Sequence, residues 1–168
     1  LDGLADTADA WVGGHGDRER TLEIMKDSHN GSAAIWAVVL VLLVKFTALG
    51  ALLLSGDTAW KGLLLAPLLG RTALLALFLT TPYARSNGLG AHYAEHLSRP
   101  AARWTLLAVV AAVLLLTGAI GFLALLAMLA GVWLLRRVFI SRVGGTTGDT
   151  AGAACELVET AVLVMLAL

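Results

Sequence analysis

The sequence predicts an all-α, polytopic membrane helix bundle with about five transmembrane helices and a polar site that faces the cytoplasm. Of its 168 residues, 58% are hydrophobic and 14% are charged, and the mean hydropathy is +0.82. Soluble domains carry nearer a quarter charged residues. Several apolar runs also approach the roughly 20 residues that cross a bilayer as a helix. The net charge of zero gives no indication of a nucleic-acid partner.

The first half of the chain predicts four helical segments. Residues 1–11 have the pattern of a helix end, and Asp17 is a plausible N-cap for a short polar helix over 18–26. Apolar runs at 33–54 and 60–80 then predict two membrane spans.

The second half predicts a helical hairpin and a final helix. A polar loop at 81–103, in which residues 92–96 are interpreted as an amphipathic surface helix, precedes an apolar stretch of 32 residues at 104–135. That stretch is too long for one ordinary span, but it accommodates two short spans that turn near the glycines at 117–121. The last helix is expected over 149–168.

The positive-inside rule supports the hairpin. With residues 10–33 in the cytoplasm, the loops at 81–103 and 136–148 are cytoplasmic too, and each of those two carries three Arg. A single helix over 104–135 would place the second group of Arg outside. The hairpin also brings two acidic segments to one membrane face.

The first acidic segment holds Asp2, Asp6 and Asp9. On a helix these residues fall within an arc of roughly 60°, so their carboxylates point the same way. Such carboxylates repel one another unless a cation lies between them, and a divalent cation that also holds a phosphate is the usual solution. A solvated acidic helix end is the alternative.

The second acidic segment holds Asp149, Glu156 and Glu159. Asp149 and Glu156 lie within about 20° of each other on a helix and about 10 Å apart along its axis. A carboxylate in an apolar membrane helix is costly and usually functional. Lys45 and Arg71 lie midway along two spans, where they either pair with these acids or bind a phosphate or substrate amide.

These motifs resemble those of the adenosylcobinamide-GDP ribazoletransferase family, also called cobalamin 5′-phosphate synthases. The resemblance covers essentially the whole chain, in order. It rests on DGLADTAD at 2–9, LEIMKDS at 22–28, YAR at 83–85, and GGTTGDT at 144–150 followed by Glu156 and Glu159. Because members of this family begin with further membrane helices, residues 1–168 are expected to form a single membrane-embedded catalytic domain without them.

The resemblance implies a Mg²⁺-dependent enzyme of the bacterial or archaeal cytoplasmic (inner) membrane. Such an enzyme joins adenosylcobinamide-GDP to α-ribazole or its 5′-phosphate and releases GMP, which completes the nucleotide loop of cobalamin. We expect Asp6 between two metal positions, flanked by Asp2 and Asp9 and completed by Asp149. Asp9 and Glu156 are both candidate bases for the attacking hydroxyl.

The substrate contacts that we expect lie in the short polar helix, the spans and the glycine-rich loop. They are Arg18, Lys26, Asp27, Ser28, Lys45, Arg71, Arg85, Gly144, Gly145, Thr147 and Gly148. Backbone amides of the glycine-rich loop could approach a phosphate closely.

Two other functions remain open from the residues. A CDP-alcohol phosphotransferase of lipid synthesis also uses Asp-rich helices and Mg²⁺, but its D-x-x-D-G-x-x-A-R motif differs from the spacing here. A non-enzymatic membrane ion transporter could use Lys45, Arg71 and Glu156, but it leaves two acidic motifs on one face unexplained.

Overall fold

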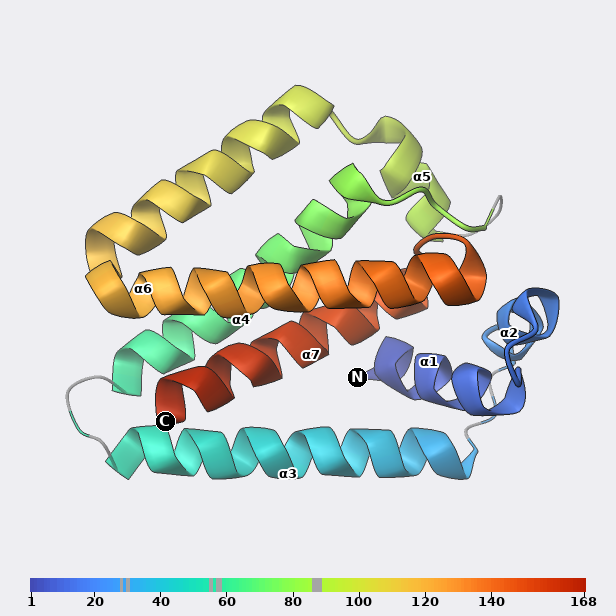
Figure 1. The fold of residues 1–168 in the computed structure, drawn as a ribbon, viewed down its shortest axis with the longest axis horizontal. Helices are drawn as coiled ribbons and strands as arrows, with labels where there is room; N and C mark the ends of the chain where they lie inside the picture. The colour runs from blue at the N-terminus through green and yellow to red at the C-terminus, as the bar shows by residue number, and fades with distance from the viewer. Residues whose placement is uncertain (28, 30, 55, 57–58, 86–88) are drawn as a thin grey trace.

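A computed structural model of the chain describes all residues except 28, 30, 55, 57–58 and 86–88. The described residues confirm the all-α architecture (Figure 1). Among them, four helices, α3, α4, α6 and α7, are long and apolar enough to cross a membrane. The helices are α1 (Asp2–Gly13), α2 (Arg18–Ile24), α3 (Ser32–Leu54), α4 (Ala59–Thr80), α5 (Leu89–His96), α6 (Arg99–Val143) and α7 (Gly148–Ala167).

The long helix α6 is a hairpin, as the sequence predicts. Gly118 has φ 59° and ψ −130°, a backbone conformation that glycine adopts and other residues strongly avoid. The chain reverses there, and its two parts, 99–117 and 119–143, run back from this turn and diverge (Figure 1). The described residues therefore provide five membrane-crossing segments.

The predicted polar loop at 81–103 includes two helical segments. It contains the short helix α5 and the first turn of α6, which begins at Arg99 with a proline in its first turn. The polar side chains of α5, including His92 and Glu95, lie on its exposed faces. The surface helix expected at 92–96 is therefore confirmed, and it begins earlier, at Leu89.

The polar elements gather at one end of the bundle. Figure 1 places α2, α5 and the connection from α6 to α7 at this end, and the turn at Gly118 lies at the opposite end. The same end holds the start of α3 and the end of α4. This arrangement confirms that the described residues of the segments 10–33, 81–103 and 136–148 share one end.

The hydrophobic core lies between α4, the second part of α6, and α7. Leu69, Leu77, Phe139, Val158 and Val162 are all fully buried there. By contrast, α3 leaves most of its apolar side chains exposed, as a helix that faces lipid does.

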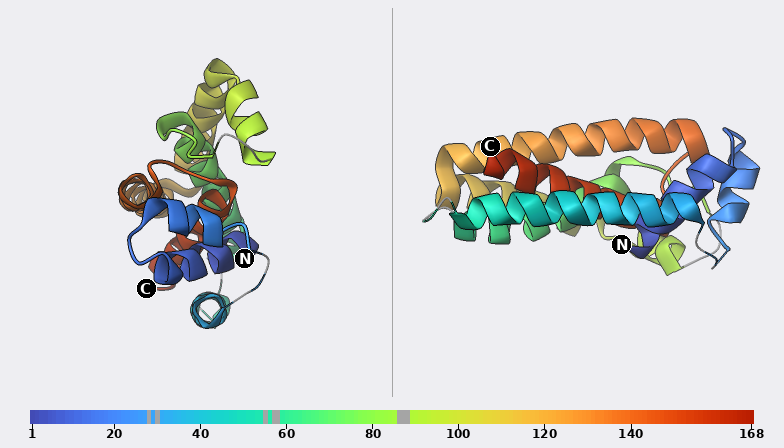
Figure 2. Two further views of the ribbon diagram at one scale, coloured as in Figure 1. Left: turned by 90° about the vertical axis from the view of Figure 1, so that its right-hand side faces the viewer. Right: turned by 90° about the horizontal axis from the view of Figure 1, so that it is seen from below.

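The short helix α1 lies between α3 and α7, and it contacts both (Figure 2). Gly3 lies so close to α7 that a Cβ there would be 2.5 Å from the carbonyl oxygen of Asp149. Such close backbone approach requires a small residue. The crossing therefore brings the first acidic segment against the first turn of α7.

Candidate functional site

The carboxylate cluster, which we define as Asp2, Asp6 and Asp149 together with Arg85, lies where α1 crosses the start of α7. Partial burial raises the pKa of Asp6, and the charges of Asp2, Asp149 and Asp9 raise it further, while Arg85 opposes them. The raised pKa thus reflects burial first and repulsion between the carboxylates second. A bound cation would relieve this repulsion.

Arg85 joins the cluster to two other elements. Its Nη1 donates a hydrogen bond to Oδ2 of Asp149 at 2.9 Å, and its Nη2 reaches the carbonyl oxygen of Leu22 at 3.5 Å. The Nε of Arg85 is buried and has no hydrogen-bond partner among the described residues. A buried donor without a partner is costly unless a ligand or water satisfies it. This donor therefore fits an anionic ligand beside Asp149.

Asp9 points to the start of α3. Its carboxylate accepts hydrogen bonds from the backbone N–H groups of Gly31 and Ala34, the latter at 2.9 Å. Carboxylates commonly cap the free N–H groups of a helix start in this way. Asp9 thus fastens α1 to α3, and its predicted catalytic and metal-binding roles remain predictions.

The loop before α7 pairs with the segment after α4. The N–H of Ala84 donates to the carbonyl oxygen of Thr146 at 2.8 Å, and the N–H of Thr146 donates to that of Pro82 at 2.9 Å. A Cβ on Gly145 would collide with the same Pro82 carbonyl oxygen. The pairing holds Arg85, which follows directly, beside the start of α7.

A capping box ends the glycine-rich loop. The hydroxyl of Thr147 accepts from the N–H of Thr150 at 3.1 Å, and the hydroxyl of Thr150 accepts from the N–H of Thr147 at 2.7 Å. Thr147 and Gly145 are buried, whereas Gly144 and Gly148 are exposed. Of the four predicted phosphate contacts in this loop, the two exposed glycines are accessible to a ligand.

The predicted contacts near α2 divide into two groups. The Nε of Arg18 donates at 2.9 Å to the last carbonyl oxygen of α6, so Arg18 supports the loop before α7. Lys26 and Asp27 are exposed, and hydrogen bonds from His29 lower the pKa of Asp27. Ser28 lies outside the described residues.

The intramembrane ion network, which we define as Lys45, Arg71, Glu156 and Glu159, lies within the spans. The Nζ of Lys45 donates to Glu156 and, at 2.8 Å, to Glu159. The Nη1 of Arg71 donates to Glu159 at 3.0 Å. Two acids thus pair with two bases. Of the two roles that the sequence left open for Lys45 and Arg71, the structure has the ion pairs with the acids. The role of Glu156 as a base remains a prediction.

The carboxylate cluster has the donor chemistry of a Mg²⁺ site. Carboxylate oxygens are the ligands that this hard cation prefers, and the raised pKa of Asp6 marks an excess of negative charge. Within the described part of the chain, no group of three or more His, Cys, Asp or Glu side chains is arranged to hold a metal ion. The predicted metal set Asp2, Asp6, Asp9 and Asp149 therefore remains a prediction.

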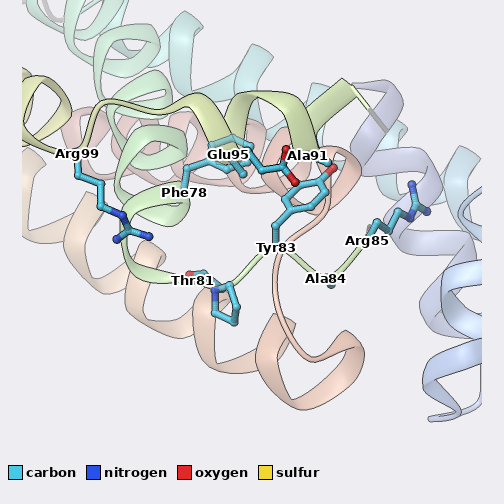
Figure 3. A pocket seen from close by; sticks show the side chains of 10 residues that line it. Phe78, Thr81, Tyr83, Ala84, Arg85, Ala91, Glu95 and Arg99 are labelled. Atoms are coloured by element: carbon cyan, nitrogen blue, oxygen red, sulfur yellow. The ribbon is translucent and has the colours of Figure 1, made fainter. Parts of the chain in front are cut away.

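Sequence patterns missed a cavity of about 510 Å³ next to Arg85. Tyr83, Glu95 and Arg99 line it, from the segment after α4, from α5 and from the start of α6 (Figure 3). These residues come from three elements within the supposed polar loop. The surface helix expected at 92–96 includes Glu95, but its pattern did not show that Glu95 lines a cavity, and the pairing of Tyr83 with Thr146 had no local signal.

The fold and the site together define a multi-pass membrane protein with a carboxylate- and guanidinium-lined site at one end of its helix bundle. The family model for cobalamin-5-phosphate synthase matches residues 1–167. The chain belongs to this family, as its motifs predict.

Relatives from several Pseudomonas species bear the name adenosylcobinamide-GDP ribazoletransferase. The protein from Pseudomonas entomophila is 57% identical over the whole chain, which covers 68% of that relative. The proteins from Pseudomonas fluorescens and Pseudomonas paraeruginosa are 58% and 60% identical over the whole chain, which covers 68% and 67% of them. No solved structure matches the chain.

Proposed function

We propose that this chain transfers a phosphate-linked cobinamide group from adenosylcobinamide-GDP to α-ribazole or α-ribazole 5′-phosphate. The products are GMP and adenosylcobalamin or its 5′-phosphate. One observation carries the proposal: a chain 57–60% identical to proteins named for this transfer brings Asp6, Asp149 and Arg85 together from three separate segments.

The transfer makes one bond and breaks one. A ribose hydroxyl oxygen of the acceptor bonds to the phosphorus next to cobinamide, and the bond from that phosphorus to the GMP oxygen breaks. The reaction requires aligned reactants, neutralised phosphate charge and a group that takes the hydroxyl proton. Arg85 can help to neutralise the phosphate charge, because its unpaired Nε can donate a hydrogen bond to a phosphate oxygen.

Mg²⁺ is the cofactor that we propose for the carboxylates of Asp2, Asp6 and Asp149, with Asp9 beside them. When bound, such a cation neutralises charge on a diphosphate. The proposed base is either Asp9 or Glu156, and both carboxylates have partners in this structure, at the start of α3 and at Lys45. To act as the base, either carboxylate must release its present partner during turnover and accept the proton of the attacking hydroxyl.

The proposed location is the cytoplasmic membrane of a bacterium or archaeon, with the site facing the cytoplasm. The polar end of the bundle carries six Arg within its two later loops, and cytoplasmic loops carry such an excess. These residues are Arg85, Arg99, Arg103, Arg136, Arg137 and Arg142.

Purified protein in lipid nanodiscs tests the proposed activity against the two alternatives. Adenosylcobinamide-GDP with α-ribazole should yield GMP, and a CDP-alcohol with an alcohol acceptor should yield no CMP. Release of CMP instead would favour the lipid-type phosphotransferase. Ion flux in liposomes without either reaction would favour a transporter.

A further inference from the structure

An apolar cavity of about 430 Å³ lies between α4, α5 and α7. This volume falls within the range of small-molecule binding sites. Its position matters because Gly148 directly precedes Asp149 of the carboxylate cluster. The walls that the argument uses are Leu74, Leu75 and Phe78 of α4, Tyr93 of α5, and Gly148 and Ala151 of α7.

Tyr83 brings a hydroxyl group to the edge of this cavity. Its ring stacks on Phe78, with ring centroids 6.2 Å apart and planes inclined by 20°. A Cβ on Gly90 would collide with the Tyr83 hydroxyl, and a Cβ on Gly148 would lie 4.0 Å from it. Both glycines line the cavity, so the hydroxyl lies between its α5 and α7 walls.

We infer that this cavity binds the aromatic base of the acceptor α-ribazole, an inference that rests on the proposed function. This base, dimethylbenzimidazole, has two fused aromatic rings, two methyl groups and one free ring nitrogen. Apolar walls suit the rings and the methyl groups. The Tyr83 hydroxyl can donate to the ring nitrogen.

Guanine, the base of the other substrate, suits this cavity poorly. Its edges carry several hydrogen-bond donors and acceptors, and the burial of these groups without partners is unfavourable. Leu74, Leu75 and Ala151 offer apolar side chains to such edges. The lining chemistry therefore favours the acceptor base.

The cavity also orients the acceptor toward the reaction. A base held against Gly148 and Ala151 leaves its ribose next to the first turn of α7. Asp149 lies in that turn, and its carboxylate contacts Arg85. The cavity thus directs the acceptor hydroxyl toward the carboxylate cluster.

Filling the cavity tests the inference. Leu75→Trp places an indole where the base would lie, so the KM for α-ribazole should rise at least tenfold with adenosylcobinamide-GDP saturating. The KM for adenosylcobinamide-GDP should stay within twofold. The matched control is Leu64→Trp, on the exposed surface of the same helix, which should leave both KM values within twofold.

Wild-type protein gives a second test that no folding defect can affect. Free 5,6-dimethylbenzimidazole should inhibit competitively against α-ribazole and non-competitively against adenosylcobinamide-GDP.

Leu75→Ala, which enlarges the cavity, should also raise the KM for α-ribazole, by about threefold or more.

The outcomes separate the inference from the proposed function. If the wild-type protein releases GMP but Leu75→Trp behaves like Leu64→Trp, or changes only the KM for adenosylcobinamide-GDP, the inference is wrong and the function stands. Failure of dimethylbenzimidazole to compete with α-ribazole would also overturn it. If the wild-type protein releases no GMP, the proposed function fails, and the inference fails with it.

Discussion

The carboxylate cluster and the intramembrane ion network use the same kinds of side chains with opposite charge balance. The network pairs two acids with two bases, so its charges compensate one another without a ligand. The cluster sets three carboxylates against one guanidinium, and burial together with this excess raises the pKa of Asp6. A balanced set suits the support of helices within a membrane, whereas an excess of carboxylates suits cation binding. We therefore expect chemistry at the cluster and structural support from the network.

Neutralising the cluster should have the largest effect. Asp6→Asn and Asp149→Asn should each lower GMP release about 100-fold or more, because each removes a carboxylate ligand of the proposed cation that neutralises phosphate charge. Initial rates with both substrates saturating measure the effect. Glu19→Gln, at an exposed position of α2, is the charge-matched control and should stay within twofold of wild type. Near-normal turnover by both Asn variants would remove the cluster from the mechanism.

Unbalancing the network should mainly affect stability. Lys45→Met leaves Glu156 and Glu159 with one base, and the loss of a partner from a buried ion pair costs about 3–5 kcal/mol. Thermal unfolding in detergent should show a lower midpoint, and the double variant Lys45→Met/Glu156→Met should recover at least half of the loss. A double variant that folds but releases no GMP would contradict the division of roles and support Glu156 as the base.

Adding a methyl group where α1 crosses α7 should have a moderate effect on stability. Gly3→Ala places a methyl group 2.5 Å from the Asp149 carbonyl oxygen, so the two helices must separate at a cost of about 1–3 kcal/mol. Turnover should fall too, because Asp6 moves with α1. Gly50→Ala in α3 meets open space and should not destabilise the protein. Equal unfolding midpoints for Gly3→Ala and wild type would show that α1 tolerates a wider spacing.

The smallest effect concerns the charge of Asp6 itself. The pKa of Asp6 in the folded protein is raised above the ordinary value of 3.8. At a pH between these two pKa values, the folded state therefore binds more protons than the unfolded state. Stability therefore falls as pH rises through this window, and the full cost is present at pH 7. Without divalent cations, Asp6→Asn should raise the unfolding midpoint at pH 7 by about 1–3 °C. The gain should shrink as pH approaches 4, and a pH-independent gain would point to a packing effect instead.

Local patterns predicted most of the fold. Hydropathy gave the spans, the glycines near Gly118 gave the hairpin, and Asp17 is the N-cap of α2, where it accepts from the N–H of Arg20 at 2.8 Å. These features depend on neighbours within a few residues along the chain. The surface helix expected at 92–96 is confirmed as well, although α5 begins earlier, at Leu89.

Contacts between distant segments were beyond sequence reasoning. The charge of Asp9 was evident, but its position at the start of α3 depends on how α1 packs. The pairing of Tyr83 with Thr146, which sets Arg85 beside Asp149, likewise joins segments more than 60 residues apart. Spacing along a helix identified which residues share a face, and only tertiary packing decided which partners they meet.

The most direct measurement is a Mg²⁺ titration of GMP release after removal of divalent cations. Wild-type protein and the control Glu19→Gln should depend on Mg²⁺ in the same way, with half-maximal rates at concentrations within twofold. Asp6→Asn should require at least tenfold more Mg²⁺ or show no activity at any concentration. Full wild-type activity without divalent cations, or an Asp6→Asn curve that matches wild type, would contradict a cation-binding role for the carboxylate cluster.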